Sequence, residues 1–321
     1  MRNIKVTIKR EIFKRVFIDY NSDHRQSIFL AGTGRSGTTW LSDIINYQNE
    51  YRLIFEPFRP DKVPLCIKFR YRQYLRPENQ DRDFIAAARA ILSGKVRSDW
   101  TDRFNERCIA SRRLIKDIRA NLLLRWMHIH FCEMPIVLLL RHPCAVAYSR
   151  LKLNWHSHLE EFLAQEELMG DFLNPFRHDI ERAQTEFEKQ IFLWCIENYI
   201  PLKQFNRGEI QVVFYENLCK KPEDEIHKLF GFLGKDWDGA VLANLRDPSP
   251  TSRRERAVMS GDTLIDSWRK HITRDQTQRA VEILSLFGLD EIYSYDSMPN
   301  VDGVNACSLS FRLESHGCET I

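Results

Sequence analysis

An apolar run, a glycine-rich turn and a helical pattern follow one another at residues 27–47, and they restrict the fold more than any other segment. The run SIFLAG is typical of a buried strand, and Leu41, Ile44 and Ile45 lie at the spacing of one helix face. The turn between them, GTGRSGTT, has the glycines of a phosphate-binding loop, whose backbone N–H groups point at an anion. The lysine of nucleoside triphosphatases is replaced by Thr38. The segment predicts a strand, a phosphate loop and a helix.

Strand and helix patterns alternate along the rest of the chain. Apolar runs predict strands at 51–58, 112–118, 135–143 and 209–218, and helical spacing predicts helices at 122–131, 145–153, 181–205, 223–234 and 273–289. The alternation predicts an α/β fold, a three-layer P-loop-like domain with a central parallel sheet flanked by helices. We expect one domain over residues 1–297, which begins with a basic segment at 1–26 and is followed by a C-terminal tail at 298–321.

Composition and charge exclude several kinds of partner. A chain of 321 residues with 43% apolar residues can bury a sizeable core, and a net charge of only +3 argues against nucleic acid. The longest apolar stretch, 135–140, is far shorter than the roughly 20 residues that cross a bilayer, and the basic first residues lack the apolar centre of a signal peptide. We therefore expect a cytoplasmic protein without a transmembrane segment. Peripheral contact of the basic start with an anionic membrane is an alternative.

The eight cysteines form no CxxC pair and have no regular spacing, so they predict no zinc site.

A second anion site is indicated at the end of the predicted central strand. Arg141 follows the run PIVLLL, at the end of a parallel strand where open α/β sheets bind ligands. Ser149 lies about two helical turns further along. The two side chains could hold a phosphate, but an arginine at a surface turn and an ordinary helical serine fit the pattern equally well. The residues alone leave both interpretations open.

Three segments together resemble the sulfotransferases that use 3'-phosphoadenosine 5'-phosphosulfate (PAPS). SIFLAGTGRSGTTWL is similar to the family's 5'-phosphosulfate loop, Arg141 with Ser149 to its 3'-phosphate motif, and VVFYENLCKKP to its later FYEDL segment. The resemblance covers residues 27–234. It implies in-line transfer of a sulfuryl group to an acceptor hydroxyl, with adenosine 3',5'-bisphosphate (PAP) as the product and no metal. It also accounts for Thr38, because the donor has no γ-phosphate for a lysine to contact.

The resemblance also implies roles for individual residues. The residues expected to bind the donor are Gly34, Arg35, Ser36, Gly37, Thr38, Thr39, Trp40, Arg141, Ser149 and Tyr215. Arg35 and Lys116 would balance charge on the leaving phosphate, and Trp40 and Tyr215 would contact the adenine. The Arg-Lys-Gly element with which cytosolic members bind the 3'-phosphate is absent here. The candidates to replace it are Arg253, Arg254 and Arg256.

The expected catalytic base distinguishes this chain from the cytosolic small-molecule sulfotransferases. Those enzymes carry a histidine two residues after the equivalent of Lys116, where this chain has Ile118. Glu56, in a Glu-Pro context, is similar to the carboxylate region of carbohydrate and tyrosylprotein sulfotransferases. A carboxylate at a strand end could accept the proton of an attacking hydroxyl, so we expect Glu56 to be the base. The competing bases are His142, which adjoins Arg141 and is expected to belong to the turn, and His156 and His158, in a loop that could border the acceptor.

The acceptor is expected to be a sugar or another hydroxyl-bearing molecule, and the sequence does not indicate an oligomeric state. Two other functions fit parts of the sequence. A P-loop kinase or nucleoside triphosphatase would require a lysine at position 38 and an acidic metal ligand, for which Asp117 is the candidate. A non-catalytic PAP- or PAPS-binding protein would be expected to lack Arg35, Lys116 or Glu56, and all three are present.

Overall fold

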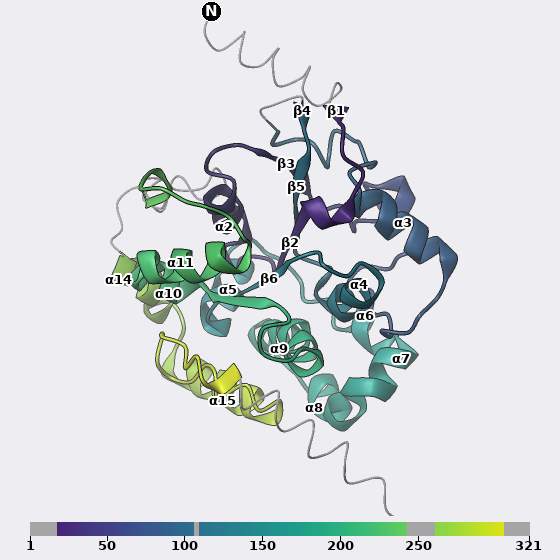
Figure 1. The fold of residues 1–321 in the computed structure, drawn as a ribbon. Coiled ribbons are helices and arrows are strands. Elements are labelled where there is room, and N and C mark those ends of the chain that lie inside the picture. The colour runs from purple at the N-terminus through teal and green to yellow at the C-terminus, as the bar shows by residue number, and fades with distance from the viewer. Residues whose placement is uncertain (1–17, 106–108, 243–260, 305–321) are drawn as a thin grey trace, which may run out of the picture. The chain divides into compact units, whose positions relative to one another are not determined.

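The computed structural model describes residues 18–105, 109–242 and 261–304 (Figure 1). The chain divides into two compact units, which are described separately. The first consists of Met1–Ala31, Thr38–Val137 and Phe230–Thr251, and the second of Gly32–Gly37, Leu138–Leu229 and Ser252–Ile321. The basic residues 1–17, the arginines Arg253, Arg254 and Arg256, and most of the predicted tail lie outside the described residues.

A five-stranded parallel sheet confirms the predicted α/β fold. Its strand order is β3-β5-β2-β6-β7, with β3 at Tyr51–Phe55, β5 at Arg112–Asp117, β2 at Ser27–Gly32, β6 at Ile136–Leu140 and β7 at Gln211–Phe214. The pairs β2–β5 and β3–β5 are parallel, with Phe29 and Ile54 both opposite Ile115. All six residues of β2 are buried, which explains its continuous apolar pattern.

The first unit contains β2, β3 and β5 and the α-helices α2 at Thr38–Ile45, α3 at Arg82–Leu92 and α4 at Leu124–His130. A short parallel pair joins β1, Ile18–Asp19, to β4, Ile109–Ala110. Short 3-10 helices occupy His24–Gln26, Pro64–Cys66 and Asn121–Leu123. The core of this unit is built from side chains of β2, β3 and β5, of which Phe29, Ile54 and Leu114 are fully buried.

The second unit is largely helical. Its α-helices are α5 at Pro143–Leu151, α6 at Glu160–Leu163, α7 at Glu166–Leu168, α8 at Arg177–Glu181, α9 at Glu186–Gln204, α10 at Tyr215–Lys220, α14 at Gly261–Asp266 and α15 at Arg274–Leu286. Helix α11, Pro222–Phe232, begins in this unit and ends in the first. A π-helical turn at Met169–Leu173 and 3-10 turns at Asn174–Phe176 and Ser267–Lys270 complete it. Helix α9 packs against α5 and α15 (Figure 1).

Several predicted boundaries were wrong, and each difference lies where an α-helix begins. The predicted strand 209–218 ends at Phe214, because Tyr215 already begins α10. The predicted helix 181–205 begins at Glu186, where Thr185 and Glu188 form a capping box that satisfies the first free N–H groups. The predicted strand 135–143 ends at Leu140, because Pro143 occupies the first turn of α5, a position that proline favours.

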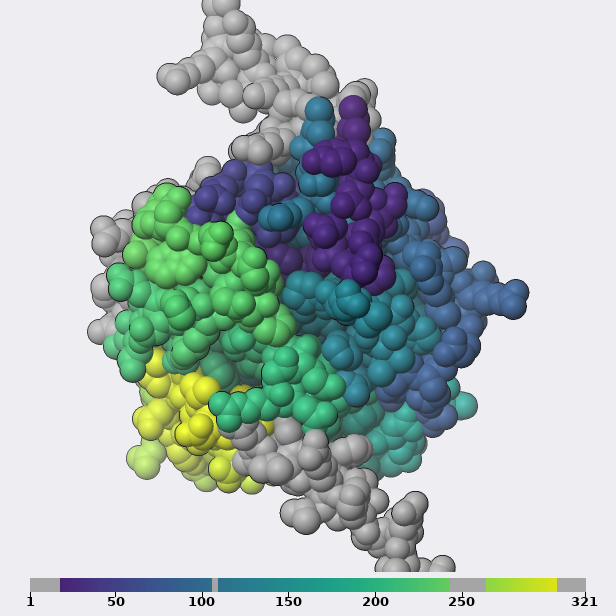
Figure 2. All heavy atoms as spheres, in the orientation of Figure 1, coloured from purple at the N-terminus to yellow at the C-terminus, as the bar shows by residue number. Residues whose placement is uncertain are grey.

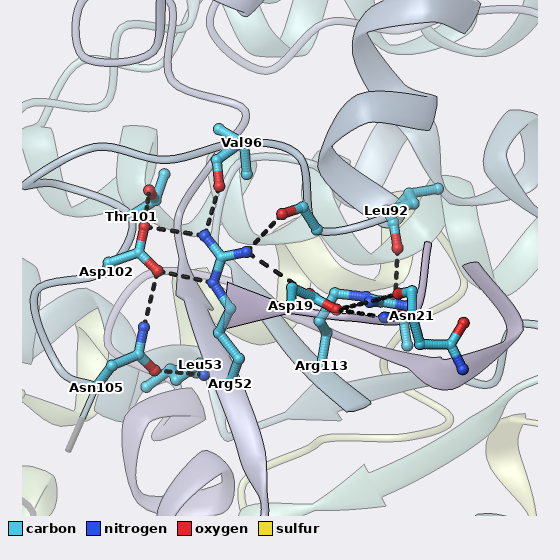
Figure 3. A network of polar contacts seen from close by, with 12 residues as sticks. Asp19, Asn21, Arg52, Leu53, Leu92, Val96, Thr101, Asp102, Asn105 and Arg113 are labelled. Carbon is cyan, nitrogen blue, oxygen red and sulfur yellow. Dashed lines mark hydrogen bonds and ion pairs between the residues drawn. The ribbon is translucent and has the colours of Figure 1, made fainter. Parts of the chain in front are cut away.

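Two buried arginines form an ionic network at the N-terminal ends of β3 and β5 (Figure 3). Arg52 donates to both oxygens of Asp102, at 2.8 and 3.0 Å, and to two backbone carbonyls in the segment after α3. Arg113 donates to Asp19 Oδ1 at 2.7 Å, to Ser27 Oγ at 2.7 Å and to the carbonyls of Asn21 and Asp23. Every one of these donors has a partner, as burial of a cation requires.

Asp19 connects the two halves of this network. Its Oδ1 pairs with Arg113, and its Oδ2 lies 3.6 Å from Arg52 Nη1. Gly94 permits the close approach, since a Cβ there would lie 2.0 Å from Asp19 Oδ2 and the φ angle is +73°. The first described residues of the chain, purple in Figure 2, lie on the surface of the first unit. Asp19 connects them to the interior of the unit through its ion pair with the buried Arg113.

Candidate active site

The predicted phosphate loop, Gly32–Gly37, connects β2 to α2. Ser36 closes a tight turn by donating its N–H and its hydroxyl to Thr33 O, at 3.1 and 2.7 Å. Gly37 has a φ of +105°, and a Cβ there would lie 2.8 Å from the ring of Tyr215. Arg35 is also in the left-handed region, with φ of 77°, which is rare for a residue with a side chain. The loop therefore has a constrained backbone of the kind that occurs at ligand sites.

Basic side chains gather on this loop within the second unit. Arg35 Nε donates to Ser149 Oγ at 2.9 Å, and Arg141 Nη1 donates to Arg35 O at 3.2 Å. The Arg141 guanidinium lies 4.2 Å from the centre of the Tyr215 ring, as a cation–π contact. The structure thus brings together four residues that were predicted from two separate motifs and the later FYENL segment. We call Arg35, Arg141, Ser149 and Tyr215 the loop cluster.

Two buried polar atoms in this region lack partners. Arg141 Nε and Thr33 Oγ1 are buried and form no hydrogen bond within the described part of the chain. Buried donors are nearly always bonded in folded proteins, so an unsatisfied guanidinium N–H at a phosphate loop fits an anionic ligand. The residues present therefore fit a phosphate-bearing ligand, for which Arg141 is the candidate cationic contact.

Arg150 supports the loop and was missed by the sequence interpretation. It is 2% exposed and donates from Nε to Gly34 O at 2.9 Å. Its other nitrogens bond Gln190 at 3.3 Å and Glu197 at 3.0 Å, both on α9. Arg150 therefore fixes a loop carbonyl to the helical part of the second unit. No sequence signal indicates this role, because an arginine beside Ser149 fits a solvated helix face equally well.

The remaining predicted donor residues form the first turn of α2. Thr38 and Trp40 are buried, with relative exposures of 3% and 6%, and Thr39 is partly exposed. The Thr39 carbonyl accepts from Ser42 Oγ at 2.7 Å, inside the helix. The side chain of Trp40 therefore belongs to the interior of the first unit, and its expected role against adenine stays a prediction.

Glu56 lies at the end of β3 in the first unit and is held at several points. It is 5% exposed and its φ is +43°. Lys116 Nζ donates to Oε1 at 2.9 Å, and Arg119 Nη1 donates to Oε2 at 2.7 Å. The Glu56 N–H donates to Lys116 O at 2.7 Å, and Trp100 Nε1 donates to Glu56 O at 3.0 Å. The structure therefore joins the predicted base to the predicted catalytic lysine, and it adds Arg119, which the sequence interpretation missed.

The surroundings set the charge of Glu56 and its neighbour Asp117. Burial acts to raise the pKa of the Glu56 carboxyl, but the ion pairs with Lys116 and Arg119 outweigh it and lower that pKa below its ordinary value. Burial and the nearby Glu56 raise the pKa of Asp117 to about 6. Asp117 accepts the N–H groups of Phe58 and Arg119, at 2.9 and 2.7 Å. Glu56 is thus a carboxylate at neutral pH.

The histidines proposed as alternative bases lie in the second unit. His156 and His158 are exposed on the loop after α5, and His158 Nδ1 lies 3.2 Å from Glu160. His142 is buried and caps α5, because its Nδ1 accepts the Cys144 N–H at 3.2 Å. The Glu56 side chain is therefore buried and held by ion pairs, whereas the His156 and His158 side chains are exposed.

The described residues contain neither a metal cluster nor a membrane span. No group of three or more His, Cys, Asp or Glu side chains there could hold a metal ion. No helix in the described ranges has both the length and the apolar character needed to span a bilayer.

Comparisons with known proteins agree with one family. A family model described as "Sulfotransferase family" matches residues 27–239, more than half of the chain. Nodulation protein NoeE of Sinorhizobium fredii is 25% identical in an alignment of 272 residues that covers 80% of this chain. The chain spans 63% of the length of that relative, which is less than two thirds of it.

Solved structures with similarity to the chain are more distant. The sulfotransferase domain from the curacin biosynthetic pathway aligns with a TM-score of 0.46 and 18% identity, over 84% of this chain and 99% of that one. Mouse sulfotransferase SULT7A1, solved in complex with PAP, aligns with a TM-score of 0.41 and 15% identity, over 84% of this chain and 85% of that one.

Proposed function

Because the chain belongs to the sulfotransferase family, and is therefore a transferase, we propose that it moves the sulfuryl group of PAPS to a hydroxyl of a sugar or similar acceptor. The observation that carries the proposal is the loop cluster, in which two arginines and a serine meet on a strained phosphate loop and Arg141 Nε has no partner among the described residues. Such a cluster suits a ligand that carries two separate phosphate groups, as PAPS and PAP do.

The loop and α2 would bind the 5' end of the donor. The backbone of Gly34 and Gly37, with the side chains of Thr38 and Thr39, would supply hydrogen bonds at the start of a helix, where the dipole favours negative charge. Ser36, which donates its N–H and hydroxyl to Thr33 O, would hold the turn around the ligand. Arg141 and Ser149 would bind the 3'-phosphate. Trp40 and Tyr215 would border the adenine.

Glu56, Lys116 and Arg35 would perform the transfer. The acceptor oxygen attacks sulfur, the bond from sulfur to the bridging 5'-phosphate oxygen breaks, and the acceptor proton passes to Glu56. Arg35 and Lys116 stabilise the charge that develops on the departing phosphate, so the products are a sulfate ester and PAP. The lowered pKa of Glu56 keeps it ionised but makes it a weak base, so positioning and electrostatics must supply most of the rate enhancement. The Glu-Pro context and Ile118 favour the carbohydrate and tyrosylprotein type over the cytosolic type.

Calorimetric titration with PAP, ADP and ATP, each with and without magnesium, tests the donor assignment. We expect PAP to bind without metal and much more tightly than ADP or ATP. A preference for ATP with magnesium would contradict the proposal and favour a P-loop kinase or nucleoside triphosphatase.

Replacing Arg141 tests the loop cluster directly. We expect Arg141→Ala to weaken PAP binding by roughly 10- to 100-fold, because a charge-assisted hydrogen bond contributes about 1.5–3 kcal/mol. The matched control is Arg177→Ala, since Arg177 is 59% exposed on α8 of the same unit and pairs only with Glu181 among the described residues. Equal PAP affinity in the two variants would exclude Arg141 from the donor site.

A further inference from the structure

A surface rich in arginine and aromatic side chains adjoins Glu56 in the first unit. The guanidinium carbons of Arg59 and Arg103 lie 4.6 and 4.9 Å from the centre of the Trp100 ring. Trp100 is half-buried and Arg103 is exposed. We call the set the arginine–tryptophan surface, which consists of Phe55, Arg59, Trp100, Arg103 and Phe104.

This surface is continuous with the candidate base. The Phe55 ring lies 5.3 Å from Trp100 and 4.8 Å from Phe104, centre to centre. Lys116 Nζ, which pairs with Glu56, lies 4.5 Å from the centre of the Phe55 ring. The Trp100 indole itself donates to Glu56 O. An acceptor whose hydroxyl reaches Glu56 would therefore meet this surface with a neighbouring part of its structure.

The charges around Glu56 leave an excess of cations. The cations are Lys116, Arg119, Arg59, Lys62 and Arg103, and the carboxylates are Glu56, Asp61 and Asp117. Lys116 and Arg119 are both paired with Glu56. Arg59 bonds Asp61 at 2.8 and 3.2 Å, and Lys62 Nζ lies 3.7 Å from the same carboxylate.

Arg103 differs from these cations in its partners. Its guanidinium contacts the rings of Phe55, Trp100 and Phe104 at 5.6, 4.9 and 5.1 Å, and among the described residues it has no ion pair with a carboxylate. Stacking on three rings orients the guanidinium while leaving its N–H groups available for a ligand. A planar guanidinium suits carboxylate and sulfate, which it can bind with two parallel hydrogen bonds.

From this arrangement we propose that the acceptor is an anionic sugar, and that Arg103 binds a carboxylate or sulfate group next to the hydroxyl that is modified. This inference rests on the proposed sulfotransferase function and adds the class of acceptor to it. The excess positive charge also raises the local concentration of an anionic acceptor, whereas a neutral sugar would gain nothing from it.

Three tetrasaccharides of similar size would show whether the enzyme prefers an anionic acceptor and whether the charge comes from a carboxylate or a sulfate. Hyaluronan tetrasaccharide carries carboxylates, chitin tetrasaccharide is neutral, and a 6-O-sulfated chitin tetrasaccharide carries sulfate. We would measure acceptor-dependent release of PAP from PAPS with each. We expect kcat/KM at least tenfold higher for one or both anionic acceptors than for the neutral one, and we expect added salt to reduce that advantage.

A matched pair of variants tests whether the preference for an anionic acceptor depends on Arg103. Arg103→Gln should remove the advantage of the anionic acceptor and leave PAP binding unchanged. Arg82→Gln makes the same charge change at an exposed position at the start of α3 and should retain the advantage. Three outcomes would each overturn the proposed acceptor class. The neutral sugar could be used as well as or better than the anionic ones, or the advantage of the anionic acceptor could survive Arg103→Gln. The third outcome is no turnover of any of the three sugars while PAP still binds. Failure to bind PAP would instead contradict the proposed function itself.

Discussion

Glu56 has an unusual backbone conformation, and its backbone and carboxylate groups all have hydrogen-bond partners. Its φ of +43° is unfavourable for a residue with a side chain, and the N–H, the carbonyl and both carboxylate oxygens are all bonded. Such a residue keeps its position when a substrate arrives, because several partners oppose its movement. Precise placement matters more here than basicity, since Lys116 and Arg119 lower the pKa of the carboxyl.

Glu56→Gln should separate binding from chemistry. The amide keeps the size of the side chain but cannot accept a proton, so we expect kcat to fall by roughly 100-fold or more while PAP binding stays the same. Rapid-quench measurement of sulfate ester formation, with calorimetry for PAP, would show this. Unchanged turnover would exclude Glu56 as the base and favour His156 or His158.

Trp100→Phe tests whether the strained backbone of Glu56 needs its indole partner. The change keeps an aromatic ring but removes the N–H that bonds Glu56 O. We expect kcat to fall by roughly 2- to 10-fold, the equivalent of one hydrogen bond, with the donor KM unchanged. Trp126→Phe is the control, because its indole bonds the Asn79 carbonyl elsewhere in the same unit, at 2.9 Å. A similar loss of kcat in both variants would point to general destabilisation.

Motif residues were more predictable than the residues that support them. Arg35, Arg141, Ser149 and the pair of Glu56 with Lys116 follow from spacing and resemblance, and the structure places them in two contact groups. Arg119 and Arg150 make equally close contacts but belong to no motif. A single arginine in a sequence does not show whether its side chain is buried against a carboxylate or solvated, because that depends on tertiary packing.

At the level of elements, the phosphate loop depends on one glycine. Gly37 needs both a positive φ and the absence of a Cβ, because Tyr215 lies in contact with it. We expect Gly37→Ala to lower the free energy of unfolding by about 1–3 kcal/mol and to weaken PAP binding, as measured by urea unfolding and calorimetry. Gly231→Ala is the matched control, since a Cβ added there would meet no atom within 4 Å and alanine favours the α11 helix. Unchanged PAP binding in Gly37→Ala would contradict the role of the loop.

Element types were predictable where the apolar pattern was long, and boundaries were not. The strands β2 and β6 are buried along their whole length, so their continuous apolar runs left little ambiguity. The run VVFY, in contrast, is divided between β7 and α10, and a short apolar run has no period that separates strand from helix. Proline is unfavourable inside a helix, yet α9 continues past Pro201 to Gln204.

For the whole molecule, the buried His142 predicts a loss of stability in mild acid. Burial lowers its pKa from the ordinary 6.5 to about 3, and its ring stacks on Trp268 at 4.5 Å. Because the unfolded chain takes up the proton below pH 6.5 and the folded chain does not, stability falls as the pH decreases from 6.5 towards 3. This group should cost about 2 kcal/mol between pH 7 and pH 5.

Urea unfolding at these two pH values checks the assignment. His142→Asn keeps a side chain that can cap α5 but does not titrate, so the difference between pH 7 and pH 5 should shrink by that amount. His271→Asn removes an exposed histidine and should leave the difference as it is in the parent chain. An unaltered pH dependence in His142→Asn would contradict the prediction.

The expectation of a single domain over residues 1–297 stays a prediction, which the number of unfolding transitions would test.

The ionic network under β3 and β5 has a practical consequence for anyone who shortens this gene for expression. The family match begins at residue 27, whereas the partners of the buried Arg113 include Asp19, Asn21 and Asp23. A protein trimmed to the matched span would lack these three partners of the Arg113 guanidinium. The loss should lower the free energy of unfolding by about 3–5 kcal/mol, a large part of the stability of many whole domains. The smallest fragment worth producing therefore begins before Asp19, upstream of the first residue of the family match.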